Sequence, residues 1–300
     1  MNPEFYLPDY LAGQRKLIDR ALAGYFSEEA AEYKTICAAA RYSLLAGGKR
    51  IRPVLCLAAA EASGARGEEV LPAACALEMI HTYSLIHDDL PEMDNDDYRR
   101  GKLTSHKVFG EDMAVLAGDA LLTEAFHLLT DREKMPKTPP ERLLTVACEI
   151  AEAAGYRGMV GGQALDVRAE GKKGDLESLC TIHRHKTGAL LRVSLRAGAI
   201  LAGADKSALA ALSAYGERIG LAFQIADDIL NVEGDSQLMG KKTGSDAELG
   251  KVTFPQLLGI DVSRTRAAEL VREAISLIDD FGDRATPLRA IAKYILDRKS

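Results

Sequence analysis

The chain of 300 residues is 47% hydrophobic and carries a formal net charge of −6. This length supports a large hydrophobic core, and no low-complexity linker or internal repeat divides the sequence, so we expect one domain over residues 1–300. The acidic balance argues against a nucleic-acid partner, because binding along a phosphate backbone uses a surplus of Lys and Arg.

The N-terminal residues and the cysteines favour a cytoplasmic protein. Residues Met1–Tyr6 lack a basic segment followed by an apolar one, and no apolar run reaches the ~18 residues of a membrane span. We therefore expect neither export nor a stable membrane anchor. The cysteines are odd in number and widely separated, which predicts reduced thiols in the core. They are Cys37, Cys56, Cys75, Cys148 and Cys180.

Apolar residues recur at helical spacing along the chain, and no alternating stretch rich in Val, Ile, Thr and aromatic residues predicts a strand. Pro53, Pro72 and Pro140 suit first helical turns, and Asp175 and Asp205 suit N-caps. The sequence therefore predicts an all-α fold of roughly ten helices, with loops at 47–48, 63–67, 131–139, 170–174 and 233–250.

The first chemical element is the heptapeptide 47–53, Gly-Gly-Lys-Arg-Ile-Arg-Pro. It lacks the glycine and Lys-Ser/Thr spacing of a Walker A loop. Lys49 and Arg52 lie at the start of an expected helix, where unpaired N–H groups and the helix dipole favour an anion. A basic pair at a helix start is more often surface charge, so the motif alone leaves both interpretations open.

The expected helix from Glu68 to His87 leads into a carboxylate cluster. His81, Ser84 and Asp88 share one face of this helix because of their spacing. Pro91 should end or kink the helix. Carboxylates this close repel one another unless a cation lies among them, and hard oxygen ligands favour Mg²⁺. The cluster and the arginines that follow it, which suit phosphate oxygens, are Asp88, Asp89, Asp94, Arg99 and Arg100.

Two other interpretations of this stretch deserve weighing. Acidic runs beside basic residues are usually solvated loops. An EF-hand is excluded because, in a loop starting at Asp94, Arg99 stands where the sharp turn needs Gly and Ser105 where a bidentate Glu belongs. A second acidic motif far along the chain favours a magnesium site over a solvated loop.

That motif is Phe223–Asn231, in which Asp227 and Asp228 again follow an apolar helical run. Asp227 and Asn231 are i, i+4 neighbours on one helix face. Two carboxylate clusters facing each other across a cavity would hold several Mg²⁺ ions around one diphosphate. The loop after the motif contains Lys241 and Lys251 beside glycines and would close over a diphosphate as a lid.

Two charged residues lie in otherwise apolar helical segments between the motifs. Asp119 follows an apolar run, and we expect it to be buried with a hydrogen-bonding or ionic partner. Lys186, in the segment His183–Gly188, is expensive to bury without an anion.

Together these motifs resemble the trans-isoprenyl diphosphate synthase (polyprenyl synthase) family, whose signatures are two motifs of the form Asp-Asp-x(2 or 4)-Asp. The resemblance covers about residues 47–259 and implies an isoprenoid synthase fold, with helices around a deep central cavity, and a homodimer. It implies three Mg²⁺ ions held by Asp88, Asp94 and Asp227, with Asp89 and Asp228 supporting. Asn231 replaces the usual final aspartate, which leaves its part in metal binding open.

The same resemblance implies head-to-tail prenyl transfer. The allylic diphosphate ionises, the double bond of isopentenyl diphosphate attacks the cation, and a proton is lost to the departing pyrophosphate. Isopentenyl diphosphate would be held by Lys49, Arg52, His81 and Arg100, beside Gly48. The allylic substrate would be held by Arg99, Lys186, Lys241 and Lys251, with Thr187 and Gln224 near the cation and Gln163 and Asp166 lining the site.

Tyr83 and Ser84 are the candidates for setting product length. Tyr83 lies five residues before Asp88, about 7.5 Å down the helix, where its ring would form the floor of the tunnel. An aromatic residue near this position resembles farnesyl-forming members, which predicts (2E,6E)-farnesyl diphosphate from dimethylallyl and geranyl diphosphate. Residues 99–122 look like geranylgeranyl synthases, so a C20 product is the alternative, and ordinary core packing is the other interpretation of Tyr83.

Three other functions would use part of these motifs. A class I terpene cyclase shares the metal-triggered ionisation but has no use for Lys49, Arg52 and His81. A non-catalytic prenyltransferase subunit would normally have eroded motifs, and these are nearly complete. A metal phosphohydrolase would use His87-Asp88 but leaves the second aspartate motif unexplained.

Overall fold

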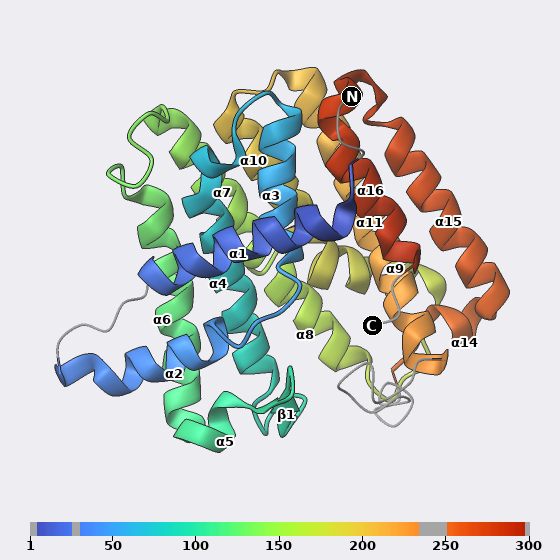
Figure 1. The fold of residues 1–300 in the computed structure, drawn as a ribbon. Coiled ribbons are helices and arrows are strands. Elements are labelled where there is room, and N and C mark those ends of the chain that lie inside the picture. Colours follow the sequence, from blue (N-terminus) through green and yellow to red (C-terminus); the bar gives the residue numbers. More distant parts are fainter. Residues whose placement is uncertain (1–4, 26–30, 234–250, 298–300) are drawn as a thin grey trace.

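The structure is a computed structural model and describes residues 5–25, 31–233 and 251–297 (Figure 1). Within these ranges the expected all-α fold is confirmed. The elements in chain order are α1 (Leu7–Tyr25), η1 (Ala31–Tyr33), α2 (Lys34–Leu44), α3 (Ile51–Ala62), η2 (Gly67–Val70), α4 (Leu71–Asp88), β1 (Tyr98–Arg99), β2 (Lys102–Leu103), α5 (Ser105–Phe109), α6 (Glu111–Thr130), α7 (Pro140–Ala154), α8 (Met159–Ala169), α9 (Leu176–His183), η3 (Arg184–Gly188), α10 (Ala189–Ala202), α11 (Lys206–Glu233), α14 (Phe254–Leu258), α15 (Ile260–Ser276), η4 (Asp279–Ala285) and α16 (Thr286–Asp297).

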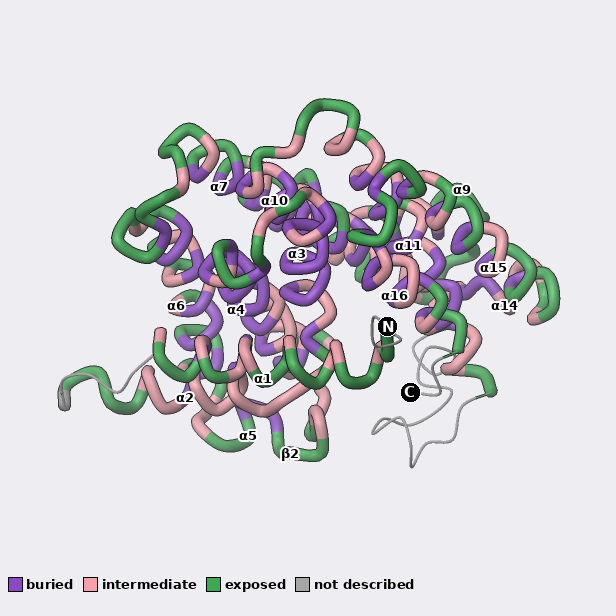
Figure 2. The backbone as a smooth tube through the Cα atoms, turned by 45° about the horizontal axis from the view of Figure 1, so that its top comes forward, coloured by how far each residue is buried: buried purple, intermediate pink, exposed green. Residues whose placement is uncertain are grey.

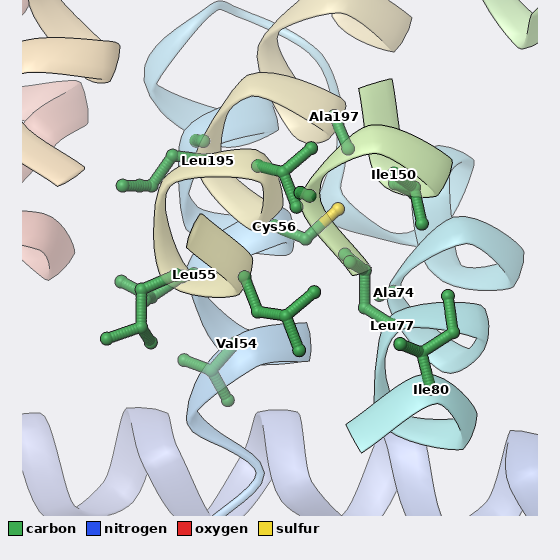
Figure 3. Close-up of a cluster of buried hydrophobic side chains, with 14 of the residues drawn as sticks. Val54, Leu55, Cys56, Ala74, Leu77, Ile80, Ile150, Leu195 and Ala197 are labelled. Carbon is green, nitrogen blue, oxygen red and sulfur yellow. The ribbon is translucent and has the colours of Figure 1, made fainter. Parts of the chain in front are cut away.

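The core is built around α3, α4 and α10, on which buried residues concentrate (Figure 2). Nine of the twelve residues of α3 are buried, as expected for a helix that is apolar on most of its circumference. Side chains of α3 and α4 pack with those of α7 and α10 (Figure 3). At Gly198 of α10, a Cβ atom would lie 2.0 Å from the carbonyl oxygen of Cys56, so glycine permits this close helix crossing.

The end of α4 positions the first acidic motif. The helix ends at Asp88, three residues before Pro91, as the proline predicts. The chain then turns, and the amide of Asp94 donates a hydrogen bond of 2.8 Å to the carbonyl oxygen of Asp88. Asp88 and Asp94 are thereby joined by a turn instead of a continuous helix.

One small element was not predicted. Strands β1 and β2 form an antiparallel hairpin in which Tyr98 pairs with Leu103 and Arg99 with Lys102. Its turn residues Arg100 and Gly101 both have positive φ, at 53° and 74°, as in the tight turns that join hairpin strands. Strands of two residues are too short to show an alternating pattern in the sequence.

The predicted helix starts at Asp175 and Asp205 are confirmed. Their side chains accept hydrogen bonds of 2.8 Å from the amides of Ser178 and Ala208. All five cysteines are free thiols, and Cys56 and Cys75 are buried as predicted. Cys37 and Cys180 are partly exposed, and Cys148 is exposed on α7, so the prediction of a core position is wrong for Cys148.

The prediction of a buried Asp119 is also wrong. Its side chain is 60% exposed, because α6 turns the neighbouring Ala117, Gly118 and Leu121 towards the core. His87 Nε2 lies 4.0 Å from one of its carboxylate oxygens.

Among the described residues, one helix, α6, is long and apolar enough to cross a membrane by length and composition alone. It contacts α2, α4, α5 and α7 in this fold. A single helix of this kind is weak grounds for a membrane span, since core helices share these properties.

Candidate active site

A cavity of about 730 Å³ lies between α4, α6, α8 and η3. His81, Ser84 and Asp88 all line it, as their shared helix face predicts. Its polar lining also includes Arg52 and Lys186. The apolar part of the wall is formed by Tyr83, Leu85, Leu90, Met93, Val115, Met159, Val160 and Val167. One cavity thus combines acidic and basic groups with room for a hydrocarbon chain.

The first two aspartates have different surroundings. Asp89 is only 3% exposed, and the guanidinium of Arg99 donates to its two carboxylate oxygens at 2.7 and 2.8 Å. Asp88 faces the cavity, where burial raises the pKa of its carboxyl to about 6. Lys186 opposes this rise, and repulsion from Asp94 adds to it. Asp89 therefore holds the hairpin arginine in place, while Asp88 presents a carboxyl group to the cavity.

A basic pocket adjoins the start of α3. Arg100 donates to the carbonyl oxygen of Gly47, and its guanidinium lies against Gly48, where a Cβ atom would be 2.7 Å from Cζ. In the described part of the chain, the buried Nε of Arg52 has no hydrogen-bond partner. Burial lowers the pKa of Arg52 to about 10, and burial together with the nearby Arg52 and Arg100 puts the pKa of His81 well below its usual value. Such a pocket favours an anion.

Lys49 is exposed on the loop that ends at this pocket. The pocket therefore brings together Arg52, His81 and Arg100, with Lys49 at its edge. These are the four residues that the resemblance assigns to isopentenyl diphosphate.

The lysine of the His183–Gly188 segment has the anionic partner that its burial requires. Lys186 Nζ lies 2.6 Å from Asp166 Oδ2. Lys251 Nζ lies 3.6 Å from Asp94, 3.8 Å from Asp166 and 3.6 Å from Glu170. Two lysines and three carboxylates thus form one network, which reaches the large cavity at Lys186. A bound diphosphate would replace the carboxylates as partner of the lysines.

Lys186 lies in η3, a π-helical turn, and so does Thr187. Turns of this kind inside α-helices occur frequently at functional sites. Both residues line the large cavity, and Gln163 lines it from α8.

The two aspartates of the second acidic motif also differ in their surroundings. Asp228 is buried and accepts a hydrogen bond of 2.9 Å from the amide of Phe254. His183 Nε2 lies 3.5 Å from the same carboxylate, and the His183 ring stacks on Phe254. Asp228 therefore ties α11 to the start of α14, close to Lys251. Asp227 is half-buried one residue earlier on α11.

A second cavity of about 140 Å³ is lined by Gln224, Asp228, Lys186 and Lys251 among others, so Lys186 borders both cavities. Gln224 Nε2 lies 3.5 Å from His183 Nδ1. Asn231 lies half-buried on the same helix. Lys241 falls outside the described residues.

The donor set fits Mg²⁺ that takes part of its coordination from substrate. Within residues 5–25, 31–233 and 251–297, no three His, Cys, Asp or Glu side chains converge to hold an ion by themselves. The Asp88 carboxyl faces the cavity, where burial and the nearby Asp94 raise its pKa, so a bound cation would stabilise its charged form. Mg²⁺ commonly binds through one or two carboxylates together with waters and phosphate oxygens.

Several residues of this site were missed by the sequence analysis. Glu78 and Arg50 form a buried ion pair beneath the basic pocket, Glu170 joins the lysine network, and His183 contacts Asp228. The signal for Glu78 was available, because it is the one charged residue in Leu71–Ile80 and a buried charge needs a partner.

Comparison with known proteins identifies the family. Residues 33–292 match the polyprenyl synthetase family. A farnesyl diphosphate synthase from Geobacillus stearothermophilus is 50% identical over 261 residues, 86% of each chain. A geranylgeranyl diphosphate synthase from Cyanophora paradoxa is 49% identical over 87% of this chain and 86% of its own. The crystal structure of an FPP/GFPP synthase from Zymomonas mobilis superposes with a TM-score of 0.88 at 41% identity, covering 96% of this chain and 98% of the other.

Proposed function

This chain belongs to the polyprenyl synthetase family, and we propose that it makes (2E,6E)-farnesyl diphosphate from isopentenyl diphosphate with dimethylallyl and geranyl diphosphate. The chain is a short-chain trans-prenyltransferase of a family that uses Mg²⁺. The proposal rests on the large cavity, because its lining includes Asp88, Lys186, Arg52, His81 and Tyr83 together.

The basic pocket would hold isopentenyl diphosphate through Lys49, Arg52, His81 and Arg100. Arg52 supports this role because its buried Nε lacks a partner among the described residues. A diphosphate would also offset the mutual repulsion of Arg52 and Arg100. His81 would take part as a neutral imidazole, since its pKa is far below the usual value.

The allylic diphosphate would be gripped by Arg99, Lys186, Lys241 and Lys251, with Thr187 and Gln224 beside the reacting carbon. Three Mg²⁺ ions, held by Asp88, Asp94 and Asp227, would neutralise charge on the leaving pyrophosphate. Asp89 and Asp228 would support this set by holding Arg99 and the start of α14.

Breaking the allylic C–O bond releases pyrophosphate and leaves an allylic cation. The double bond of isopentenyl diphosphate then forms the new C–C bond, and a proton passes to the pyrophosphate. Cationic side chains held in place before the reaction would stabilise the charge that develops on the pyrophosphate. The apolar wall of the cavity accepts the prenyl tail.

We further propose that each chain is one domain and acts in a cytoplasmic homodimer. Adjacent helices α6 and α7 support the dimer, because both expose large apolar side chains, among them Leu116 and Leu144, which are 52% and 71% exposed. Where such side chains form a contiguous patch, they are typical of protein interfaces.

A C20 product is the second candidate. Relatives of nearly equal identity carry farnesyl and geranylgeranyl names, so sequence similarity does not separate the two. Tyr83 favours the shorter product, because its ring occupies part of the cavity wall.

The test is to incubate the purified chain with Mg²⁺ and labelled isopentenyl diphosphate, adding dimethylallyl, geranyl or farnesyl diphosphate in parallel, and to size the products. C15 from the first two, with no extension of farnesyl diphosphate, supports the proposal. Predominant C20 replaces it with the second candidate. A cyclic hydrocarbon from farnesyl diphosphate alone would indicate a terpene cyclase, and no turnover until a partner chain is added would indicate a non-catalytic subunit.

A further inference from the structure

A carboxylate lies buried beneath the basic pocket. Glu78 is on α4, three residues before His81, and is 1% exposed. A carboxylate in such a position is costly unless cations or hydrogen-bond donors compensate it. The residues that compensate Glu78 belong to the pocket or to the loop that forms it.

The main partner of Glu78 is Arg50, the residue immediately before α3. Arg50 Nη1 lies 2.5 Å from Glu78 Oε1, its Nε lies 2.8 Å from Asp19 Oδ1, and its Nη2 donates to the carbonyl oxygen of Leu44 at 2.7 Å. The Arg50 side chain is fully buried. One guanidinium therefore connects the loop 47–50 to α1, to the end of α2 and to α4.

The backbone of Arg50 is strained. Its φ of 52° lies in the left-handed region, which residues with a Cβ atom seldom adopt. Such a conformation persists where surrounding contacts impose it. The three contacts of the Arg50 side chain impose it here, and they hold the loop that carries Gly48 and Lys49.

Glu78 also reaches the other side of the pocket. Its Oε1 lies 3.8 Å from Arg100 Nη2, and the Arg100 guanidinium covers Gly48. One carboxylate is thus shared between Arg50 and Arg100, and its charge also favours the cationic form of Arg52. Without it, the guanidinium groups of Arg50 and Arg100, which repel one another, would lose their buried shared counter-ion and depend on the more exposed Asp19.

We propose that Glu78 is a positioning residue for isopentenyl diphosphate, holding the 47–50 loop and Arg100 in the geometry that receives the diphosphate without touching it. This inference rests on the proposed function of the pocket. Through its charge alone, Glu78 would weaken the binding of the diphosphate, because a carboxylate near an anion site repels the anion. The two effects therefore predict opposite changes when the charge is removed.

The deciding variant is Glu78→Gln, which keeps the shape of the side chain and removes its charge. We expect the KM for isopentenyl diphosphate to rise about tenfold or more, as for the loss of an outer partner of a binding site. The KM for geranyl diphosphate should change less than about threefold. A general loss of structure would move both constants, so the difference between them identifies positioning.

Glu61→Gln is the matched control. Glu61 lies near the other end of α3, where it accepts hydrogen bonds from Tyr10 Oη at 2.7 Å and from Gln14 Nε2 at 3.1 Å. This substitution also removes a carboxylate that joins α1 to α3, but it leaves the basic pocket untouched. Both KM values should stay within about twofold of the parent enzyme.

An unchanged KM for isopentenyl diphosphate in Glu78→Gln would overturn the proposal. A lower KM would also overturn it, because Glu78 would then act only through its charge. If the variant does not fold, the double variant Arg50→Met, Glu78→Leu replaces the ion pair by apolar groups, which folded proteins often tolerate. Parent-like affinity in the folded double variant would likewise reject positioning.

Calorimetric binding of isopentenyl diphosphate alone separates this inference from the proposed function. Without an allylic substrate there is no turnover, so the heat reports the pocket directly. If the parent chain binds isopentenyl diphosphate but forms no product, the proposed function fails and the positioning test stands. If the parent is active and the variants bind equally well, only the role of Glu78 fails.

Discussion

Tyr83 is the residue through which the structure bears on product length. It is 6% exposed, lines the large cavity, and packs edge-on against His87 with ring centroids 5.7 Å apart. Tyr83→Ala should enlarge the cavity and shift the product from C15 towards C20 or longer, at a stability cost of about 3–5 kcal/mol for losing a buried aromatic ring. Chromatographic sizing of the labelled products measures the shift.

Tyr83→Phe is the control for this change, since it keeps the ring and removes only the hydroxyl. It should retain the parent product. If Tyr83→Ala is active and makes the parent product, Tyr83 belongs to the core packing and does not set the length.

Asp88 should make the metal-free chain less stable as the pH rises. Its folded pKa of about 6 exceeds the ordinary 3.8, so the folded chain binds this proton more tightly than the unfolded chain. The free energy of unfolding therefore falls between about pH 4 and pH 6. Asp88→Asn removes this penalty and, without Mg²⁺, should be more stable than the parent at pH 7 by about 1–3 kcal/mol, with the gain vanishing near pH 4.

Urea unfolding at pH 4 and pH 7 in the presence of a chelator measures this difference. Asp97→Asn is the control, because the exposed Asp97 is hydrogen-bonded to Lys107, which lowers its pKa. That substitution should bring no gain at pH 7. Equal stability of Asp88→Asn and the parent at both pH values would show that the charged Asp88 carboxyl does not destabilise the fold.

The π-helical turn η3 is packed between α8 and α11. At Gly162 of α8 a Cβ atom would lie 2.1 Å from the amide nitrogen of Lys186, and at Gly220 of α11 one would lie 3.0 Å from Gly188 Cα. Gly162→Ala should push α8 and the turn apart and displace Lys186. We expect a loss of about 1–3 kcal/mol of stability and a higher KM for the allylic substrate.

Gly13→Ala in α1 is the matched control, because no heavy atom lies within 4 Å of its Cβ position. It should raise stability by up to about 1 kcal/mol through helix propensity alone. Steady-state kinetics of both variants measure the effect. A Gly162→Ala enzyme with parent-like KM would show that the contact between α8 and the turn does not position Lys186.

Part of the fold and of the site could be predicted from the sequence. Helical spacing correctly placed His81, Ser84 and Asp88 on the cavity wall, and the capping aspartates marked two helix starts, because both signals are local. Contacts between distant segments have no local signal. The bond from the amide of Phe254 to Asp228 and the pairing of Lys186 with Asp166 depend on how helices cross, which periodicity does not specify.

The misplaced residues have the same physical origin. An apolar helix such as α6 has more than one face that could be buried, and its packing against α4 leaves Asp119 outside. Glu78 shows the reverse case, in which a charged residue is buried because its partner, Arg50, lies 28 positions earlier in the chain. Burial of charge becomes predictable only when both partners are recognised.

For the whole molecule, the proposed dimer rests on exposed apolar side chains of the neighbouring helices α6 and α7. Leu116 and Leu144 are exposed there, and Val115, 40% exposed, lies on the same helix as Leu116 and also lines the large cavity. A second copy packed on this face would bury these side chains and close the cavity beside Val115. Burial of one leucine contributes about 1.5–3 kcal/mol, so a charge in its place opposes association strongly.

Leu144→Glu should therefore convert the dimer to a monomer at micromolar concentration and lower the activity, because the cavity wall loses its cover. Sedimentation velocity measures the assembly, and product formation measured on the same samples shows whether the two losses coincide. Val262→Glu on α15 is the control, since Val262 is 54% exposed on another helix and should tolerate the charge. A parent chain that sediments as a monomer would reject the dimer. A fully active Leu144→Glu monomer would instead show that each cavity is complete within one chain.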